Sequence, residues 1–218
     1  MSLPPDLRED LSARFGPITV ARRVVGGDIG RSLLIELAGR PFFLKYLHDA
    51  PAGFFAAEQA GLEALRVASA GDLHVPIVAD SNDHPGGWSW ILLEWLEEGR
   101  STESDRRLGE GLAKLHRRGA EGWGWHRDGF IGRLPQSNAT HRTWAEFWWC
   151  ERLEPQLAMA RGKGDLGAAG EWERLREALP ALLAPAEEDG PSLLHGDLWS
   201  GNVVYASVGP ALIDPACY

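Results

Sequence analysis

The sequence is poor in cysteine and has no long apolar run. Its 218 residues include two cysteines, Cys150 and Cys217, too few for a disulfide framework and without a metal-binding spacing. We therefore expect a protein of the reducing cytoplasm. Nowhere do about eighteen apolar residues follow one another. Residues 1–10 are polar and acidic, where a signal peptide would be basic and then apolar. From these absences we expect a protein that is neither secreted nor inserted in a membrane.

Positive charge is also scarce. The chain has 22 lysines and arginines against 31 aspartates and glutamates, which gives a net charge of −9. Because that charge repels polyanions, we expect no nucleic-acid partner. The composition, 44% hydrophobic and 24% charged, is ordinary for a globular protein. A chain of this length can bury a sizeable core, as one large domain or as two small lobes.

The first half of the chain has the pattern of β-strands around one helix. Segments rich in β-branched and large apolar residues alternate with turns that contain glycine, which favours an antiparallel meander. We expect strands at 18–25, 32–37, 41–47, 74–79 and 88–96, and a helix at 51–70. Five side chains of that helix fall on one face: Phe54, Phe55, Glu58, Leu62 and Leu65.

From about residue 101 the pattern becomes helical. Apolar residues recur every three or four positions in three stretches, 108–115, 144–153 and 171–183. A stretch rich in glycine and alanine, 161–170, predicts a loop between the last two of these helices. We therefore expect a sheet in the first part of the chain and helices in the second.

The most informative segment is 194–202, Leu-His-Gly-Asp-Leu-Trp-Ser-Gly-Asn. Asn202 stands five residues after Asp197, and Asp214 ends a strand-like stretch twelve residues later. Phosphoryl transfer from ATP needs one carboxylate at the attacking hydroxyl, and an amide oxygen and a second carboxylate to hold Mg²⁺. One hairpin supplies all three groups, which predicts a kinase.

Lys45 and Glu58 form a second candidate pair. Period two places Lys45 on the same strand face as Phe43 and Leu47, where a lysine can also serve only to guard a sheet edge. Glu58 lies on the apolar stripe of the next helix. Burying its carboxylate is costly unless a cation meets it, and Lys45 is the obvious partner. Together they resemble the pair that holds ATP phosphates in kinases.

Two further segments would complete a nucleotide site. Gly26 and Gly27 join the first two strands, where their backbone either approaches phosphates or forms an ordinary hairpin turn. The acidic segment 94–98, which starts at Glu94, is the predicted hinge where backbone groups meet adenine. The order of elements predicts an α+β, two-lobed protein-kinase-like fold, with an antiparallel-sheet N-lobe at 1–98 and a mainly helical C-lobe at 99–218.

A second His-x-Asp sequence competes with the first. His126-Arg127-Asp128 matches the protein-kinase catalytic triplet letter for letter. Five residues after its aspartate stands Arg133, which is no Mg²⁺ ligand, and no suitably placed strand aspartate follows. We therefore assign the catalytic loop to 195–202.

Two neighbours of the candidate site carry expectations of their own. Trp199 lies two residues past Asp197, so its ring either stacks on a sugar or simply packs within the loop. Pro215 disfavours helical geometry in the residue before it. We therefore expect Asp214 to be extended and less able to swing out than the corresponding aspartate of a protein kinase.

Several segments resemble the fructosamine kinase family, also called ketosamine 3-kinases, within the aminoglycoside phosphotransferase-like kinases. They are HGDLWSGN, ALIDPACY, GFIGRLPQSN, WAEFWWCERLEPQLAMA and LGEGLAKLHRR. The Trp-Ser-Gly after the aspartate is the specific part, and the resemblance covers nearly all of the chain. It implies a kinase that uses ATP and Mg²⁺ to phosphorylate the 3-hydroxyl of a ketosamine, free or on a protein lysine, so that the adduct later falls off.

The same resemblance assigns roles to single residues. It implies that Asp197 is the catalytic base, that Asn202 and Asp214 hold Mg²⁺, and that Lys45 and Glu58 are the ATP-phosphate pair. Gly26 and Gly27 fall in the nucleotide loop. Trp199 and His195 are further candidates for contact with the substrate.

The chain departs from the family pattern in three places. His126 and Gly129 stand where we expect Asp and Asn, and Asp28 stands where some relatives have a cysteine. The sequence stops at Tyr218, where relatives continue with an acidic segment and further helices, so we expect an incomplete C-lobe and a monomer or weak dimer. The alternatives to a ketosamine kinase are a kinase for another hydroxyl acceptor, aminoglycoside-like or choline-like, and an inactive nucleotide-binding pseudokinase.

Overall fold

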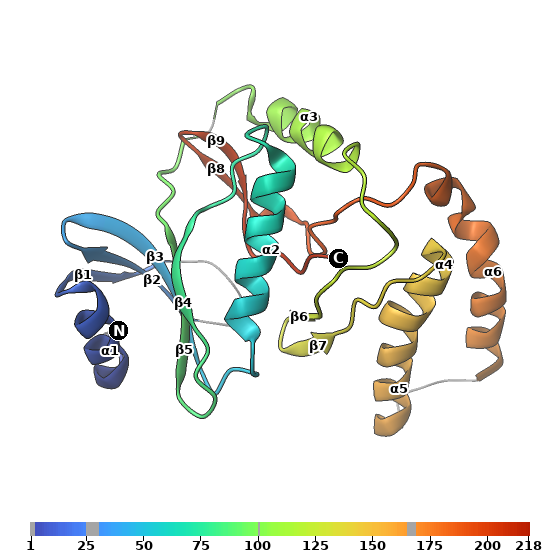
Figure 1. The fold of residues 1–218 in the computed structure, drawn as a ribbon, viewed down its shortest axis with the longest axis horizontal. Coiled ribbons are helices and arrows are strands. Elements are labelled where there is room, and N and C mark those ends of the chain that lie inside the picture. The colour runs from blue at the N-terminus through green and yellow to red at the C-terminus, as the bar shows by residue number, and fades with distance from the viewer. Residues whose placement is uncertain (1–2, 25–30, 100, 165–168) are drawn as a thin grey trace.

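The computed structural model describes residues 3–24, 31–99, 101–164 and 169–218 (Figure 1). The first half contains α1 (Pro5–Phe15), β1 (Ile18–Arg23), β2 (Arg31–Leu37), β3 (Arg40–His48), α2 (Phe54–Ser69), β4 (Val78–Asn82) and β5 (Trp88–Glu94). The second half contains α3 (Ser104–His116), β6 (Gly129–Ile131), β7 (Leu134–Gln136), α4 (Trp144–Phe147), α5 (Glu154–Lys163), α6 (Ala169–Glu188), β8 (Val203–Ala206) and β9 (Gly209–Leu212). A π-helical stretch, Trp148–Leu153, joins α4 to α5, and a short 3₁₀ turn, Ser200–Asn202, precedes β8. Among the described helices, none has the length and apolar character that a membrane crossing requires.

The five strands of the first half form one antiparallel sheet in the order β1-β2-β3-β5-β4. Its side chains alternate between two faces, as the period of a strand requires. Leu44 and Trp90 face a core shared with α1, whereas Ile91 and Leu93 face a core shared with α2. Figure 1 shows the sheet nearly edge-on, with α1 on one side and α2 on the other. The sheet therefore holds α2 against the face that carries Lys45.

The predicted strands and the helix of the first half are present, with shifted ends: the helix begins at Phe54 instead of 51, and β5 ends at Glu94 instead of 96. Residue 25, the predicted end of the first strand, lies outside the described residues. Two differences are larger. β4 begins four residues later than expected, because residues 74–77 form the connection that leads into it. Helix α1 was not predicted from the sequence, although Leu3, Leu7 and Leu11 are spaced four residues apart. All three are buried against the sheet. Pro5 stands in the first turn of the helix, a favoured position for proline, and the apolar stripe is narrow.

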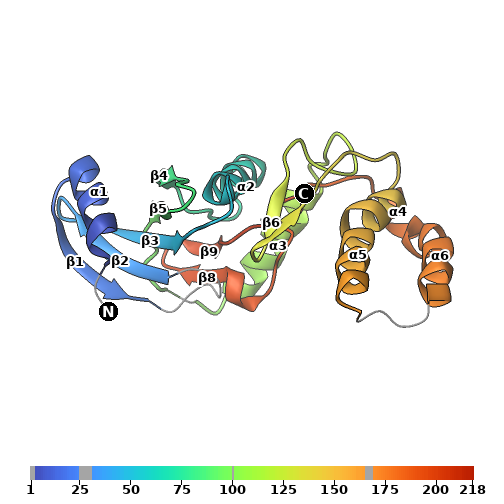
Figure 2. The ribbon, with the colours of Figure 1, turned by 90° about the horizontal axis from the view of Figure 1, so that it is seen from below.

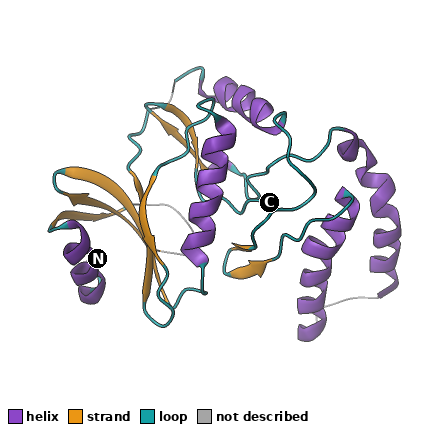
Figure 3. Cartoon of the chain, viewed as in Figure 1, coloured by secondary structure: helices purple, strands orange, loops and turns teal. Residues whose placement is uncertain are grey.

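The second half is mainly helical, as predicted, but it includes two small hairpins. The β6–β7 hairpin was not predicted, because each strand has only three residues. Helices α4, α5 and α6 pack on one another through Ala145, Leu157 and Leu179, together with Trp149 of the π-helical stretch. Figure 2 shows these helices at the end of the molecule opposite to β1, and Figure 3 shows that most strands lie at the other end. The arrangement confirms the α+β, two-lobed kinase-like fold.

The β8–β9 hairpin is bonded to the sheet-bearing part of the molecule, although it comes from the second half of the chain. Its last strand pairs in parallel with His74, on the connection between α2 and β4, and its first strand ends beside Glu98. Backbone hydrogen bonds run from the His74 amide to Pro210, and from the Ser207 amide to Glu97. Because the hairpin is tied to the sheet-bearing part, the segment that follows β9 comes to lie beside Lys45. We retain residue 98 as a proposed boundary between the lobes.

Candidate active site

The loop 195–202 places an amide beside a carboxylate. The side-chain Nδ2 of Asn202 donates to the backbone oxygen of Asp197 at 2.8 Å and to its Oδ2 at 3.1 Å. Asn202 is buried, and its backbone amide donates to the oxygen of Trp199, which closes the 3₁₀ turn. Since the Asn202 amide nitrogen is used within the loop, its Oδ1 is the atom left for a cation.

Gly196 is the point where the loop touches the segment after β9. Its φ is +83°, and a Cβ built on it would lie 1.8 Å from the backbone oxygen of Ala216. The amide of Ala216 donates to the oxygen of His195 at 2.8 Å. The close approach explains why glycine stands between His195 and Asp197, since any larger residue would push the two segments apart.

His195 lies beneath the loop and is buried. Its Nε2 contacts the oxygen of Ile213 at 2.9 Å, and the backbone amide of Asp197 donates to its Nδ1 at 3.3 Å. These partners fit a neutral ring that carries its proton on Nε2. Burial lowers the pKa of His195, although the oxygen of Ile213 and the carboxylate of Asp197 oppose the shift. The ring does not line the cavity described below. Its contacts with Asp197 and Ile213 instead join the loop 195–202 to the segment after β9.

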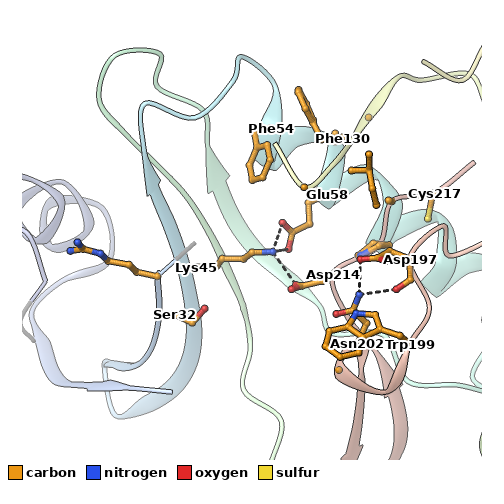
Figure 4. A pocket seen from close by; sticks show the side chains of 18 of the residues that line it. Ser32, Lys45, Phe54, Glu58, Phe130, Asp197, Trp199, Asn202, Asp214 and Cys217 are labelled. Carbon is orange, nitrogen blue, oxygen red and sulfur yellow. Dashed lines mark hydrogen bonds and ion pairs between the residues drawn. The ribbon is translucent and has the colours of Figure 1, made fainter. Parts of the chain in front are cut away.

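Asp214 has a left-handed backbone, with a φ of +53°. The expectation of an extended conformation before Pro215 is therefore wrong. Proline disfavours the right-handed helical region for the residue before it, and aspartate is among the residues that tolerate the left-handed region. Strained backbone of this kind costs about 1–3 kcal/mol and is commonly found at functional sites. The turn directs the Asp214 carboxylate toward Lys45 (Figure 4).

Lys45 joins the two halves of the site through a buried ion cluster. Its Nζ lies 2.9 Å from Oε2 of Glu58, 3.1 Å from Oε1 of Glu58 and 3.0 Å from Oδ1 of Asp214 (Figure 4). Burial alone would lower the pKa of Lys45, but the two carboxylates outweigh it and raise that pKa. Burial also raises the pKa of Glu58, which the charge of Lys45 opposes. The pairing expected from the sequence is present, and Asp214 is a third member.

A cavity of about 870 Å³ lies between these groups. Its described lining includes Lys45, Glu58, Asp197, Trp199, Asn202 and Asp214. Trp199 is 56% exposed, and its ring packs over Gly201, where an added Cβ would lie 2.3 Å from the ring. This opening is thus shared by several elements: β2, β3, α2, the β6–β7 hairpin, the loop 195–202 and the segment after β9.

Several predicted site residues lie elsewhere. Gly26, Gly27 and Asp28 fall outside the described residues. Glu94 does not line the cavity, because its Oε2 lies 3.1 Å from Nε2 of His74 and accepts the amide of Ile77. In the competing triplet, Asp128 does not line the cavity, although its neighbour Gly129 does. Oδ1 of Asp128 accepts the backbone amide of Asn138 at 2.9 Å, which braces the loop.

Sequence reasoning missed an aromatic wall of the cavity. Phe54, from the first turn of α2, lies 5.3 Å from Phe130 of β6, measured between ring centroids, and Trp125 lines the same opening. Phe54 was assigned only to the apolar face of its helix, and nothing in the sequence indicated that Phe130 would meet it. Cys217 also lines the cavity, but burial raises its pKa to about 12, so the thiol stays protonated.

The residues present fit a magnesium ion only with help from a ligand. Among the described residues, no group of three His, Cys, Asp or Glu side chains could hold a metal ion. Asn202 and Asp214 offer an amide oxygen and a carboxylate, which are oxygen ligands of the kind that Mg²⁺ prefers. Because Mg²⁺ commonly takes its other ligands from substrate phosphates and water, this donor set suits an ion that arrives with a nucleotide.

Comparison with known proteins gives consistent matches. The model of the family described as fructosamine kinase matches residues 7–218. A probable ketoamine kinase of Enterococcus faecium is 34% identical over 88% of this chain and 68% of its own length. A chloroplastic protein-ribulosamine 3-kinase of Arabidopsis thaliana is 34% identical over 92% of this chain and 62% of its own length. The crystal structure of a putative fructosamine-3-kinase from Thermobifida fusca matches with a TM-score of 0.79 and 34% identity, over 97% of this chain and 73% of that one. The chain thus spans about two thirds of the length of these curated relatives.

Proposed function

The chain belongs to the fructosamine kinase family, and from this membership we propose that it transfers the terminal phosphoryl group of ATP to the 3-hydroxyl of a ketosamine. The acceptor is the sugar part of an early glycation adduct, free or on a protein lysine. Phosphorylation there makes the adduct fall off, so the reaction serves protein deglycation. We further propose that it takes place in the cytoplasm.

One observation carries the proposal: Asp197, Asn202, Asp214 and Lys45 all line a single cavity. A kinase needs a carboxylate at the acceptor and cationic groups at the phosphates, on opposite sides of the transferred group. Lys45 lies on the sheet side and Asp197 on the loop side of this cavity (Figure 4). An acceptor hydroxyl near Asp197 and a triphosphate near Lys45 would fit this arrangement.

The proposed roles follow from the chemistry of each group. Asp197 orients the acceptor hydroxyl and receives its proton late in the transfer. Lys45, positioned by Glu58, neutralises charge on the phosphates. Asn202 and Asp214 would hold Mg²⁺, which supplies further neutralisation of phosphate charge when bound. Lys45 and Asp214 are in contact in this structure, so they approach the phosphates as neighbours.

The exposed Trp199 and the wall of Phe54 and Phe130 suit an acceptor with a polar sugar and an apolar arm. A sugar ring can stack on an indole, and the carbon chain of a glycated amine can lie against phenyl rings. An aminoglycoside, which carries several amines around its rings, matches this wall less well. We therefore favour a ketosamine over the alternative acceptors.

The proposal is tested by Asp197→Asn, which keeps the shape of the side chain and removes its charge. We expect ATP binding to persist while kcat falls by about 10²-fold or more, the scale for losing a positioned acid or base. ATP binding is measured by calorimetry and ribulosamine phosphorylation by ADP release, on the same preparation.

Three outcomes would contradict the proposal. Retained turnover by Asp197→Asn would remove Asp197 from the chemistry. Phosphorylation of aminoglycosides but not of ribulosamine by the unmodified protein would move the acceptor class. An unmodified protein that binds ATP and Mg²⁺ yet releases no ADP with any ketosamine would favour the pseudokinase.

A further inference from the structure

Helix α2 begins without a side-chain cap of its own. Its N-cap residue is Gly53, which has a φ of +77° and no side chain, and the first turn contains no acidic residue. The first amides of a helix have no partner within the helix and need acceptors from elsewhere. The amide of Phe54 donates to the oxygen of Pro51, and the amide of Ala57 makes the first regular helical bond, to the oxygen of Gly53.

Asp83 supplies the acceptors for the two amides between them. The amide of Phe55 donates to its Oδ1 at 3.0 Å, and the amide of Ala56 donates to its Oδ2 at 2.9 Å. Asp83 lies 28 residues away from Phe55 in the sequence, in the turn between β4 and β5. A negative charge at this end of a helix is also favoured by the helix dipole. A distant hairpin thus caps α2.

The turn that carries Asp83 is itself held in place. The amide of the next residue, His84, donates to Oγ of the buried Ser89 at 2.9 Å. Ser89 belongs to β5 and pairs with Leu47 of β3, two residues beyond Lys45 on the same strand. The Asp83 carboxylate is therefore fixed relative to Lys45 through the sheet.

Helix α2 carries two residues of the active site within one turn of this cap. Glu58 bonds with Lys45, and Phe54 lines the cavity. A helix whose first turn loosens or shifts moves both of them. From the cap, the fixed turn and the position of Glu58, we propose that Asp83 is a positioning residue that sets the distance between Glu58 and Lys45 and so prepares the site for nucleotide phosphates. This inference rests on the proposed kinase function.

The test compares Asp83→Ala and Asp83→Asn with Asp80→Ala. Asp80 lies on β4 of the same hairpin, but its Oδ1 accepts only the amide of its neighbour Ser81 and its ion pair with Arg14 is long, at 3.8 Å. Asp80→Ala therefore removes a carboxylate from the hairpin without touching α2. Each protein, as the full chain, is titrated with Mg²⁺ and a non-hydrolysable ATP analogue in a calorimeter.

We expect Asp83→Ala to weaken nucleotide binding by about fivefold, the scale of losing a helix cap. Asp83→Asn keeps one acceptor oxygen, so its loss of nucleotide affinity should be about half as large. Asp80→Ala should bind the nucleotide as the unmodified protein does. If Asp83→Ala does not fold, Asp83→Asn takes its place in every comparison. Binding at the unmodified level by the folded Asp83 variants would overturn the inference.

A double-mutant cycle separates positioning from general stability. Each Asp83 variant is also made in a Glu58→Gln background. If Asp83 acts through Glu58, its loss should change the dissociation constant in the original background and hardly at all beside Glu58→Gln. An equal loss in both backgrounds would show that Asp83 merely stabilises the fold. Failure of the unmodified protein to bind the analogue would overturn the proposed function itself, and with it the inference.

Discussion

At the scale of the residue, the site depends on backbone that only particular side chains permit. Asp214 adopts a left-handed conformation, and Gly196 brings the loop 195–202 against Ala216. The sequence motif contained both residues, but it indicated their chemistry and not their backbone. The rule for residues before proline excluded one region of conformational space and left open which of the others Asp214 would occupy.

Gly196→Ala should lower the free energy of unfolding by about 3 kcal/mol, because it combines a positive φ with an overlap that neither backbone can relieve easily. Gly190→Ala is the matched control. Gly190 has a φ of +80° but nothing within 4 Å of an added Cβ, so it tests the backbone cost alone, about 1 kcal/mol. Urea unfolding of both variants measures the difference. Equal losses would show that the contact with Ala216 does not constrain the loop.

At the scale of the element, strong periodicity was enough to predict most of the fold. The strands β2, β3 and β5 and the helices α2 and α3 follow their apolar patterns closely. α1, the β6–β7 hairpin and the π-helical stretch were missed, since short or weakly patterned segments take their structure from the surfaces that they pack against. The pairing of Lys45 with Glu58 was predictable because each would be costly to bury alone.

Helix α1 should stabilise the sheet without contributing to the site. Leu11 is fully buried in the core on the face of the sheet opposite to Lys45. Leu11→Ala should therefore lower the free energy of unfolding by about 3 kcal/mol. Leu182→Ala, at an exposed position of α6, should change it by less than about 0.5 kcal/mol. Nucleotide affinity of the folded Leu11 variant should stay unchanged, and a large loss of affinity would place α1 in the functional unit.

At the scale of the whole molecule, buried His195 makes stability depend on pH. Its pKa is lowered by burial from an ordinary value of 6.5, so the unfolded chain binds a proton more readily than the folded protein. The stability that this residue contributes is present above pH 6.5 and is lost as the pH falls through the lower pKa of the folded state. The free energy of unfolding should therefore be lower at pH 5.5 than at pH 7.5, because histidine titrates in about this range.

The measurement is urea unfolding across that range for the unmodified protein, His195→Gln and His116→Gln. Burial lowers the pKa of His116 as well, so each substitution should flatten part of the slope. A slope unchanged by His195→Gln would mean that His195 does not hold a depressed pKa in the folded protein.

The backbone hydrogen bonds of the β8–β9 hairpin limit how the two parts of the molecule can move relative to one another. Hydrogen bonds join this hairpin to the sheet-bearing part at His74 on one side and at Glu97 on the other. A hinge motion that separated Lys45 from Asp214, now 3.0 Å apart, would have to break both connections together. Thermal opening should instead concentrate in the α4–α6 helices at the far end. The cavity would therefore keep its shape while these helices move, since none of its described lining residues belongs to α4, α5 or α6.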